Sequence, residues 1–239
     1  MPGEEDAPDM VLLHYFMGRG RAETTRWMLA ANGIAFENRP LRTAEDFAAL
    51  KATGKLPFNQ LPLLEIDGRN LSQSTATTRY LARKGGFYGD GPDDEVMCDM
   101  VAGAAADFAE AALQYAFQPT HEAGRALAAK SFDKFAPRFE AILERGGTGW
   151  MAGRRMSFAD VLLSEALENY REIDAGFFDA APGLAGLLAR VKAHEGIAAY
   201  LAGPNRWRMP DAQYVIDVAR VLQRALPPHM PDPDRFVVT

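Results

Sequence analysis

The sequence changes character near residue 90, and this change constrains the fold more than any other feature. Before it, short runs of apolar and aromatic residues alternate with short helical segments; after it, stretches rich in alanine, leucine and glutamate continue almost to the end. A chain of 239 residues is long enough to form two units with separate cores. We therefore expect a mixed α/β domain followed by an all-helical domain.

The first segment follows the order β-α-β-α-β-β-α, which predicts a small mixed sheet covered by helices. Thr43 and Asp46 have the spacing of a helix cap, and Asp67-Gly68 is a strong signal for a hairpin turn. Pro40 is expected to end the second strand. The expected strands are residues 11–16, 34–41, 61–66 and 69–71, and the expected helices lie within residues 18–33, 43–54 and 74–84.

The second segment predicts helices throughout. Ser157 and Asp160 again have the spacing of a capping pair, and one helix carries an apolar stripe that indicates a core. The stripe consists of Phe132, Phe135, Phe139 and Ile142. The expected helices are residues 95–117, 123–144, 157–172, one that begins at residue 182, 195–201 and 213–226.

Acidic, glycine-rich and proline-rich stretches mark the boundaries between these parts. The stretch FYGDGPDDE has the composition of a linker, and the last residues contain several prolines. The expected organisation is a disordered acidic leader (1–9), an α/β domain (10–86), a linker (87–94), a helical domain (95–226) and an irregular proline-rich tail (227–239).

Charge and cysteine content exclude several kinds of partner and site. Lys and Arg number 26 against 32 Asp and Glu, and the net charge of −6 disfavours a nucleic-acid partner. The single cysteine, Cys98, excludes an intramolecular disulfide and a cysteine zinc site, and we interpret it as a small buried residue. The acidic start is unlike a signal peptide, and no apolar run approaches the ~18–20 residues of a membrane span. We expect a cytoplasmic protein with no membrane partner.

Common catalytic motifs are incomplete in this sequence. Gly18-Arg-Gly20 begins like a dinucleotide-binding fingerprint, but Glu23 stands at the third glycine position. The four histidines lie far apart without metal-ligand spacing, so we expect no metal site. No GxSxG sequence supports a serine nucleophile.

Two places in the first segment suggest more than packing. Tyr15 lies at the end of the first strand and is followed by Arg19 and Arg21; the plain alternative is a half-buried tyrosine with two solvated arginines. Pro62 stands at the entrance of the third strand, where proline costs a hydrogen bond of the sheet. If the bond before it is cis, the backbone there can face a ligand; the alternative is an ordinary proline at the start of a strand.

A third such place lies before the expected helix 74–84. Gln73 and Ser74 precede this helix, whose free N–H groups and dipole form an anion site with the Ser74 hydroxyl as cap. The alternative is ordinary capping without a ligand.

Together these stretches resemble the cytosolic glutathione transferases of the alpha and sigma classes. LHYFMGRGRAETTRWMLAANGIAFE is similar to their first βαβ unit, and KLPFNQLPLLEIDG and LSQSTATTRYLA to the glutathione-binding half of their thioredoxin-like domain. GRRMSFADVLL, which contains Asp160, is similar to the capping motif of their helical domain. The resemblance covers residues 11–225 and implies a thioredoxin-like α/β domain plus an all-α domain. The first strand is not followed by a cysteine, so disulfide exchange is not expected.

The resemblance implies a role for each matching residue. Tyr15 would be the catalytic tyrosine that donates to the glutathione sulfur, and Arg21 would add positive field there, while Arg19 is structural. Asp107 and Lys134 would reach the glutathione of the neighbouring subunit. Within one subunit, the residues that would bind glutathione are Tyr15, Lys51, Gln60, Leu61, Pro62, Gln73 and Ser74. Lys51 and Lys134 stand where the alpha class commonly has arginines, which keeps the charge but loses the bidentate fork.

The resemblance also implies a homodimer and an apolar second site. Phe58 matches the aromatic key that inserts into the partner subunit, although a core phenylalanine is the alternative. The segment 213–226 resembles a mobile lid helix. The electrophile site would be formed by this helix with Phe16, Gly18, Leu113 and Phe117.

The implied activity is conjugation of glutathione, the co-substrate, to apolar electrophiles, with no metal and with peroxidase or isomerase side activities. Two alternatives remain open at this point. One is a glutathione-dependent isomerase similar to prostaglandin D synthase, and the other is a non-catalytic protein that binds glutathione or apolar ligands. The residues do not indicate which electrophile is the physiological substrate.

Overall fold

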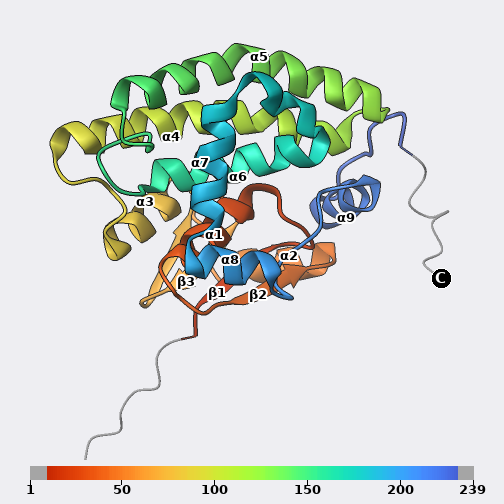
Figure 1. Cartoon of the computed structure of the whole chain (residues 1–239). Helices are drawn as coiled ribbons and strands as arrows, with labels where there is room; N and C mark the ends of the chain where they lie inside the picture. Colours follow the sequence, from red (N-terminus) through yellow and green to blue (C-terminus); the bar gives the residue numbers. More distant parts are fainter. Residues whose placement is uncertain (1–9, 231–239) are drawn as a thin grey trace, which may run out of the picture.

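The computed structural model describes residues 10–230 (Figure 1). A small sheet domain lies below a larger group of helices, and the predicted combination of a thioredoxin-like α/β domain with an all-helical domain is confirmed. The predictions made for residues 1–9 and for 231–239 lie outside the described residues.

The sheet has four strands in the spatial order β2-β1-β3-β4. β1 (Leu12–Phe16) pairs in parallel with β2 (Glu37–Leu41) and antiparallel with β3 (Leu63–Ile66), which forms the predicted hairpin with β4 (Arg69–Ser72). β2 ends at Leu41, as predicted, but it begins at Glu37 rather than at residue 34, and Pro40 lies within the strand instead of ending it. β2 is an edge strand, where a proline without an N–H is tolerated.

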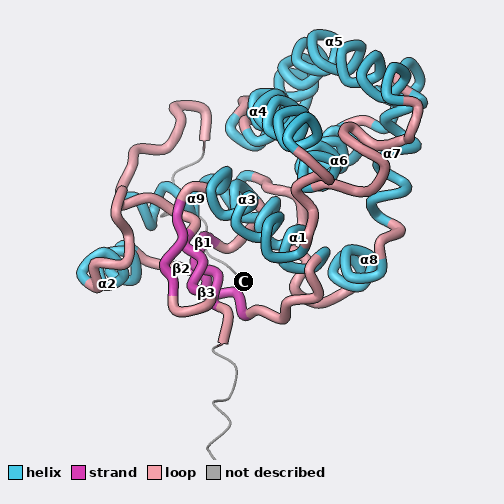
Figure 2. Tube along the Cα trace, turned by 90° about the vertical axis from the view of Figure 1, so that its left-hand side faces the viewer, coloured by secondary structure: helices cyan, strands magenta, loops and turns pink. Residues whose placement is uncertain are grey.

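Helices cover both faces of this sheet (Figure 2). α2 (Ala44–Ala52) lies on one side, and α1 (Glu23–Ala31) and α3 (Ser74–Gly85) lie on the other, toward the helical domain. A 3-10 turn, η1 (Gly20–Ala22), separates β1 from α1, so this helix begins later than the glycine-rich turn. The predicted capping pair of Thr43 and Asp46 is confirmed at the start of α2.

The helical domain begins three residues before the predicted start, at Pro92, whose missing N–H is harmless in a first helical turn. Its last helix ends at Leu222 rather than at 226, because Gln223 has a positive φ of 51°. The elements are α4 (Pro92–Leu113), η2 (Tyr115–Phe117), α5 (His121–Gly146), α6 (Phe158–Ile173), η3 (Ala175–Ala180), α7 (Pro182–Lys192), α8 (Glu195–Ala202) and α9 (Ala212–Leu222).

Aromatic side chains form the core of this domain around the buried helix α6. The rings of Phe108 and Tyr170 stack with their centroids 4.2 Å apart, and Phe132 and Phe139 from the predicted apolar stripe pack beside Phe108. Cys98 is buried and unpaired, as predicted, and burial raises the pKa of its thiol to about 11. No helix within residues 10–230 is long and apolar enough to cross a membrane.

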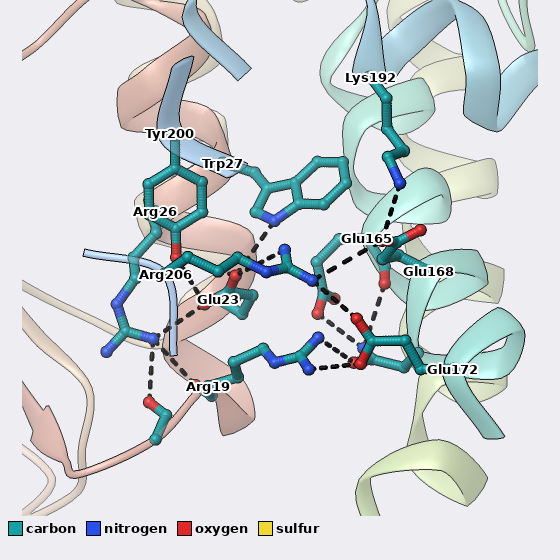
Figure 3. A network of polar contacts seen from close by, with 12 residues as sticks. Arg19, Glu23, Arg26, Trp27, Glu165, Glu168, Glu172, Lys192, Tyr200 and Arg206 are labelled. Carbon is teal, nitrogen blue, oxygen red and sulfur yellow. Dashed lines mark hydrogen bonds and ion pairs between the residues drawn. The ribbon is translucent and has the colours of Figure 1, made fainter. Parts of the chain in front are cut away.

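A buried network of charged side chains joins the two domains (Figure 3). At its centre, the Glu23 carboxylate of α1 accepts hydrogen bonds from Arg26 (3.0 Å), Trp27 Nε1 (3.2 Å) and the Tyr200 hydroxyl (2.9 Å). Arg206, from the segment between α8 and α9, lies 3.5 Å from the same carboxylate. This segment is therefore tied to the first helix of the sheet domain.

The other side of the network belongs to α6. Glu172 binds Arg206 (3.0 Å) and Arg19, which confirms Arg19 as a structural residue. Glu168 binds Arg171 and, from α7, Lys192. Although burial opposes ionisation of Glu168, its hydrogen bonds to these cations lower its pKa to about 2.

The pKa of Glu165, also on α6, is shifted in the opposite direction. Burial and the negative charge of Glu23 raise its pKa from 4.5 to about 8, against the weaker effects of Arg19, Arg206 and a hydrogen bond from Asn169. At neutral pH the folded protein therefore holds a proton on Glu165 that the unfolded chain releases.

Replacing Glu165 by glutamine is expected to flatten the pH dependence of stability. Between pH 4.5 and 8 the folded state binds one proton more than the unfolded state, so stability falls by about 1.4 kcal/mol per pH unit as the pH rises. Glutamine resembles the protonated acid and removes this loss. The free energy of unfolding, measured in denaturant from pH 5 to 8, tests this prediction. The exposed Glu144→Gln is the control. If the free energy of unfolding depends on pH in the same way for wild type and Glu165→Gln, the prediction is contradicted.

Candidate active site

Tyr15 lies near the end of β1 with its hydroxyl group held by two partners. The side chain is buried, its oxygen accepts a hydrogen bond from the Arg21 backbone N–H (2.9 Å), and the Tyr214 hydroxyl of α9 lies 3.3 Å away. The turn that brings Arg21 to this oxygen requires Gly20, whose φ is +42°. The plain alternative of a half-buried tyrosine with two solvated arginines is wrong for Tyr15 and Arg19, which are both buried, while the Arg21 side chain is exposed.

The side chain of Arg21 points toward α4. Its Nη2 lies 2.6 Å from the carboxylate of Glu110, and both side chains are largely exposed. The contact of Arg21 with Tyr15 is thus made by the backbone, while its guanidinium forms an ion pair with Glu110 at the edge of the cavity.

A cavity of about 500 Å³ adjoins Tyr15 and has the size of a small-molecule site. It is built from the end of β1, the loop before β3, the start of α3 and the end of α9. Most of the residues expected to act in catalysis or to bind glutathione meet here: Tyr15, Arg21, Gln60, Leu61, Pro62, Gln73 and Ser74. The other lining residues are Phe16, Phe47, Asn59, Thr75, Leu222 and Arg224. Of these, Phe16 was expected by name, and Leu222 and Arg224 belong to the segment 213–226 that was expected to border the electrophile site.

The start of α3 leaves hydrogen-bond donors free for a ligand. Gln73 holds the N-cap position with a positive φ of 68° and makes no side-chain cap; its Nε2 instead donates to Gln60 Oε1 at 2.7 Å. The prediction that the Ser74 hydroxyl caps the helix was wrong, because this hydroxyl donates to the Arg21 carbonyl oxygen (3.1 Å). Uncapped N–H groups and the helix dipole favour an anionic ligand group. The Leu61–Pro62 peptide bond in the same wall is cis.

Four residues that were expected to bind glutathione or the partner subunit lie outside this cavity. Lys51 lies on α2 with its Nζ 4.6 Å from the ring centre of Phe47. Asp107 and Lys134 are exposed on α4 and α5, and Phe58 is 62% exposed, which excludes the alternative of a core phenylalanine.

The residues expected to form the electrophile site do not share one cavity. Phe16 lines the cavity beside Tyr15, while Gly18 borders another cavity that the 206–217 segment lines. Leu113 lines a 90 Å³ cavity between the domains, and Phe117 packs at the edge of the core. The position of α9 contributes to this separation, because α9 lies against β1 and η2.

Comparisons with known proteins agree with this arrangement. A family model described as "Glutathione S-transferase, N-terminal domain" matches residues 11–83, and one described as "Glutathione S-transferase, C-terminal domain" matches residues 106–204. Glutathione S-transferase alpha-5 of Rattus norvegicus is 37% identical over 85% of this chain and 93% of its own. Glutathione S-transferase A3 of Mus musculus is 36% identical over 88% of this chain and 97% of its own.

Solved structures give the same result. The glutathione S-transferase from Ascaris lumbricoides is 31% identical, with a TM-score of 0.72 and coverage of 84% of this chain and 99% of that one. NaGST-2 is 28% identical, with a TM-score of 0.72 and coverage of 82% and 97%. The chain therefore belongs to the glutathione S-transferase family.

Proposed function

We propose that this glutathione transferase activates glutathione as a thiolate through Tyr15 and conjugates it to apolar electrophiles. The observation that carries the proposal is the position of the Tyr15 hydroxyl in the wall of a cavity that also contains the uncapped start of α3. The cavity thus combines a hydroxyl donor for a sulfur atom with backbone donors for a carboxylate.

The energy required is within reach of one hydrogen bond. A free thiol has a pKa of about 8.5, and lowering it by about 2 units requires about 2.7 kcal/mol. One well-placed donor in a preorganised site contributes about 2.7–4 kcal/mol. The Tyr15 O–H is therefore sufficient, and the positive charge of Arg21 acts in the same direction.

The cavity walls suggest how the rest of the tripeptide is held. Gln73 and the start of α3, with Ser74, bind the γ-glutamyl carboxylate, and the backbone of Leu61 before Pro62 pairs with the cysteinyl group. Gln60 serves the glycyl end together with Lys51, which lies outside the cavity over the ring of its lining residue Phe47. The electrophile lies against Phe16, Gly18, Leu113 and Phe117, with α9 as a further wall of its site. Glutathione is the co-substrate, and no metal takes part.

A homodimer completes the proposed site. Phe58 is the exposed aromatic key, and the exposed apolar residues Val96 and Met100 lie one helical turn apart on α4, the helix that also carries Asp107. Asp107 and Lys134, which lie outside their own subunit's cavity, would then reach the glutathione of the partner. The buried, unpaired Cys98 is consistent with a cytoplasmic location.

Replacing Tyr15 by phenylalanine tests the proposal. We expect the pKa of the thiol of bound glutathione to rise by about 2 units, from about 6.5 to about 8.5. The thiolate fraction at pH 7 then falls from about 0.76 to about 0.03, so kcat/KM at this pH is expected to fall about 25-fold. The thiolate absorbance in the ultraviolet, followed against pH, measures the first, and conjugation of chlorodinitrobenzene measures the second. Tyr80→Phe is a control, because the Tyr80 hydroxyl donates to Asp67 and neither residue lines the cavity. Equal thiol pKa values in the two variants would refute the role of Tyr15.

The two alternative functions are less well supported. The curated relatives are named as transferases, which does not favour an isomerase. A non-catalytic binding protein has no need of a buried tyrosine hydroxyl that a backbone N–H holds at the cavity wall.

A further inference from the structure

A second tyrosine hydroxyl lies beside that of Tyr15. Tyr214 belongs to the first turn of α9, almost 200 residues away in the sequence, and its oxygen is 3.3 Å from the Tyr15 oxygen. Asp211 fixes the start of this helix by accepting a hydrogen bond from the Tyr214 backbone N–H at 3.0 Å. Both tyrosines are buried.

Two glycines make room for this pair. A Cβ atom at Gly18 would lie 2.5 Å from Cδ2 of the Tyr214 ring, and one at Gly20 would collide with the hydroxyl oxygens of both tyrosines. The Gly-Arg-Gly sequence that fails as a dinucleotide fingerprint therefore has another explanation here. The absence of side chains at Gly18 and Gly20 allows the phenol rings of Tyr15 and Tyr214 to pack directly against the backbone of this turn.

The buried network of charged side chains (Figure 3) fixes both the turn after β1 and the segment that leads into α9. Arg26 donates to the carbonyl oxygens of Gly18 (3.0 Å) and Arg19 (3.3 Å), which fixes the turn below the two hydroxyls. Arg206 fixes the segment that leads into α9. Both arginines meet at Glu23, so the turn and the start of α9 share one anchor.

The number of hydrogens that each hydroxyl can donate decides whether Tyr15 or Tyr214 is the donor in this contact during catalysis. A phenol has one hydrogen to donate and can accept two hydrogen bonds. The Tyr15 oxygen already accepts the Arg21 N–H, and its own hydrogen is needed for the sulfur. Among the described residues, Tyr15 is the one hydrogen-bond partner of the Tyr214 hydroxyl, and burial raises the pKa of Tyr214, which keeps it protonated.

We propose that Tyr214 donates its hydroxyl hydrogen to the Tyr15 oxygen and is a positioning residue for thiol activation. The Arg21 N–H and the Tyr214 O–H then occupy both acceptor positions of Tyr15 and leave its O–H directed at the glutathione sulfur. Two donors also withdraw electron density from the Tyr15 oxygen, which strengthens its own hydrogen bond to a thiolate. The inference rests on the proposed role of Tyr15.

A double-mutant cycle of Tyr15→Phe and Tyr214→Phe tests this inference. Tyr214→Phe keeps the ring on Gly18 and removes only the hydroxyl. We expect it to raise the thiol pKa of bound glutathione by about 0.5–1 unit, which lowers kcat/KM about 3- to 10-fold below the thiol pKa. At high pH the rate recovers to that of the wild type. In the Tyr15→Phe background, Tyr214→Phe is expected to change the thiol pKa no further.

The outcomes separate the two claims. If Tyr15→Phe leaves the thiol pKa unchanged, the proposed role of Tyr15 fails, and the inference fails with it. If Tyr15→Phe raises the thiol pKa and Tyr214→Phe does not, the inference alone is overturned. It is also overturned if Tyr214→Phe has the same effect with and without the Tyr15 hydroxyl. Tyr80→Phe controls for the loss of a phenol elsewhere, and thermal unfolding of each variant shows that the fold is retained.

Discussion

Replacing Asp160 by alanine is expected to lower the free energy of unfolding by about 3–5 kcal/mol. The buried carboxylate accepts hydrogen bonds from the backbone N–H groups of Met151 (2.7 Å) and Ser157 (2.7 Å) and from the Ser157 hydroxyl (2.6 Å). Alanine leaves these three buried donors without an acceptor, and each such donor costs about 1–3 kcal/mol. The substitution therefore destabilises the start of α6, the helix around which the core of the helical domain is built.

The chain contains a matched control for this substitution. Thr43 and Asp46 form the same capping box at the start of α2, but on the surface, where water replaces the lost acceptor. Asp46→Ala is therefore expected to cost far less than Asp160→Ala. Denaturant unfolding of the two variants measures the difference, and equal losses would show that burial of the cap at α6 contributes nothing.

Short-range signals in the sequence predicted the parts of the site that depend on neighbouring residues. The cap at Ser157, the hairpin at Asp67-Gly68 and the proline at the entrance of β3 each depend on a few adjacent residues, and the structure contains all three. The place of Tyr15 near the end of β1 could be predicted because its strand and the turn after it are local, whereas its catalytic role is implied by the resemblance alone. The prediction that the Ser74 hydroxyl caps its helix was wrong because this hydroxyl donates to the carbonyl oxygen of Arg21, a residue distant in sequence.

Contacts between distant segments gave no sequence signal. Tyr214 meets Tyr15 only because α9 folds back over β1, and an amphipathic helix pattern does not show which element it will cover. Glu23 was noticed only as a failed glycine position. Its real role, as the acceptor for groups from α1, α8 and the segment before α9, depends on the packing of the two domains.

Replacing Glu23 by leucine is expected to destabilise the protein by about 3–5 kcal/mol, since it breaks a buried ion pair from one side. The substitution leaves the cation of Arg26 buried without its partner, and Trp27 Nε1 and the Tyr200 hydroxyl lose their acceptor. The free energy of unfolding in denaturant measures the loss. Glu37→Leu is the control, because its ion pair with Arg39 is largely exposed and such pairs contribute at most about 1 kcal/mol.

A double variant separates the buried charge from the other lost contacts. Adding Arg26→Met to Glu23→Leu removes the uncompensated cation, so the double variant is expected to be more stable than Glu23→Leu alone. Its turn, however, lacks the donor that Arg26 gives to the Gly18 carbonyl, and the hydroxyl of Tyr15 depends on that turn. We therefore expect stability to recover in part while conjugation activity does not. If activity returns together with stability, the network supports the fold without positioning the site.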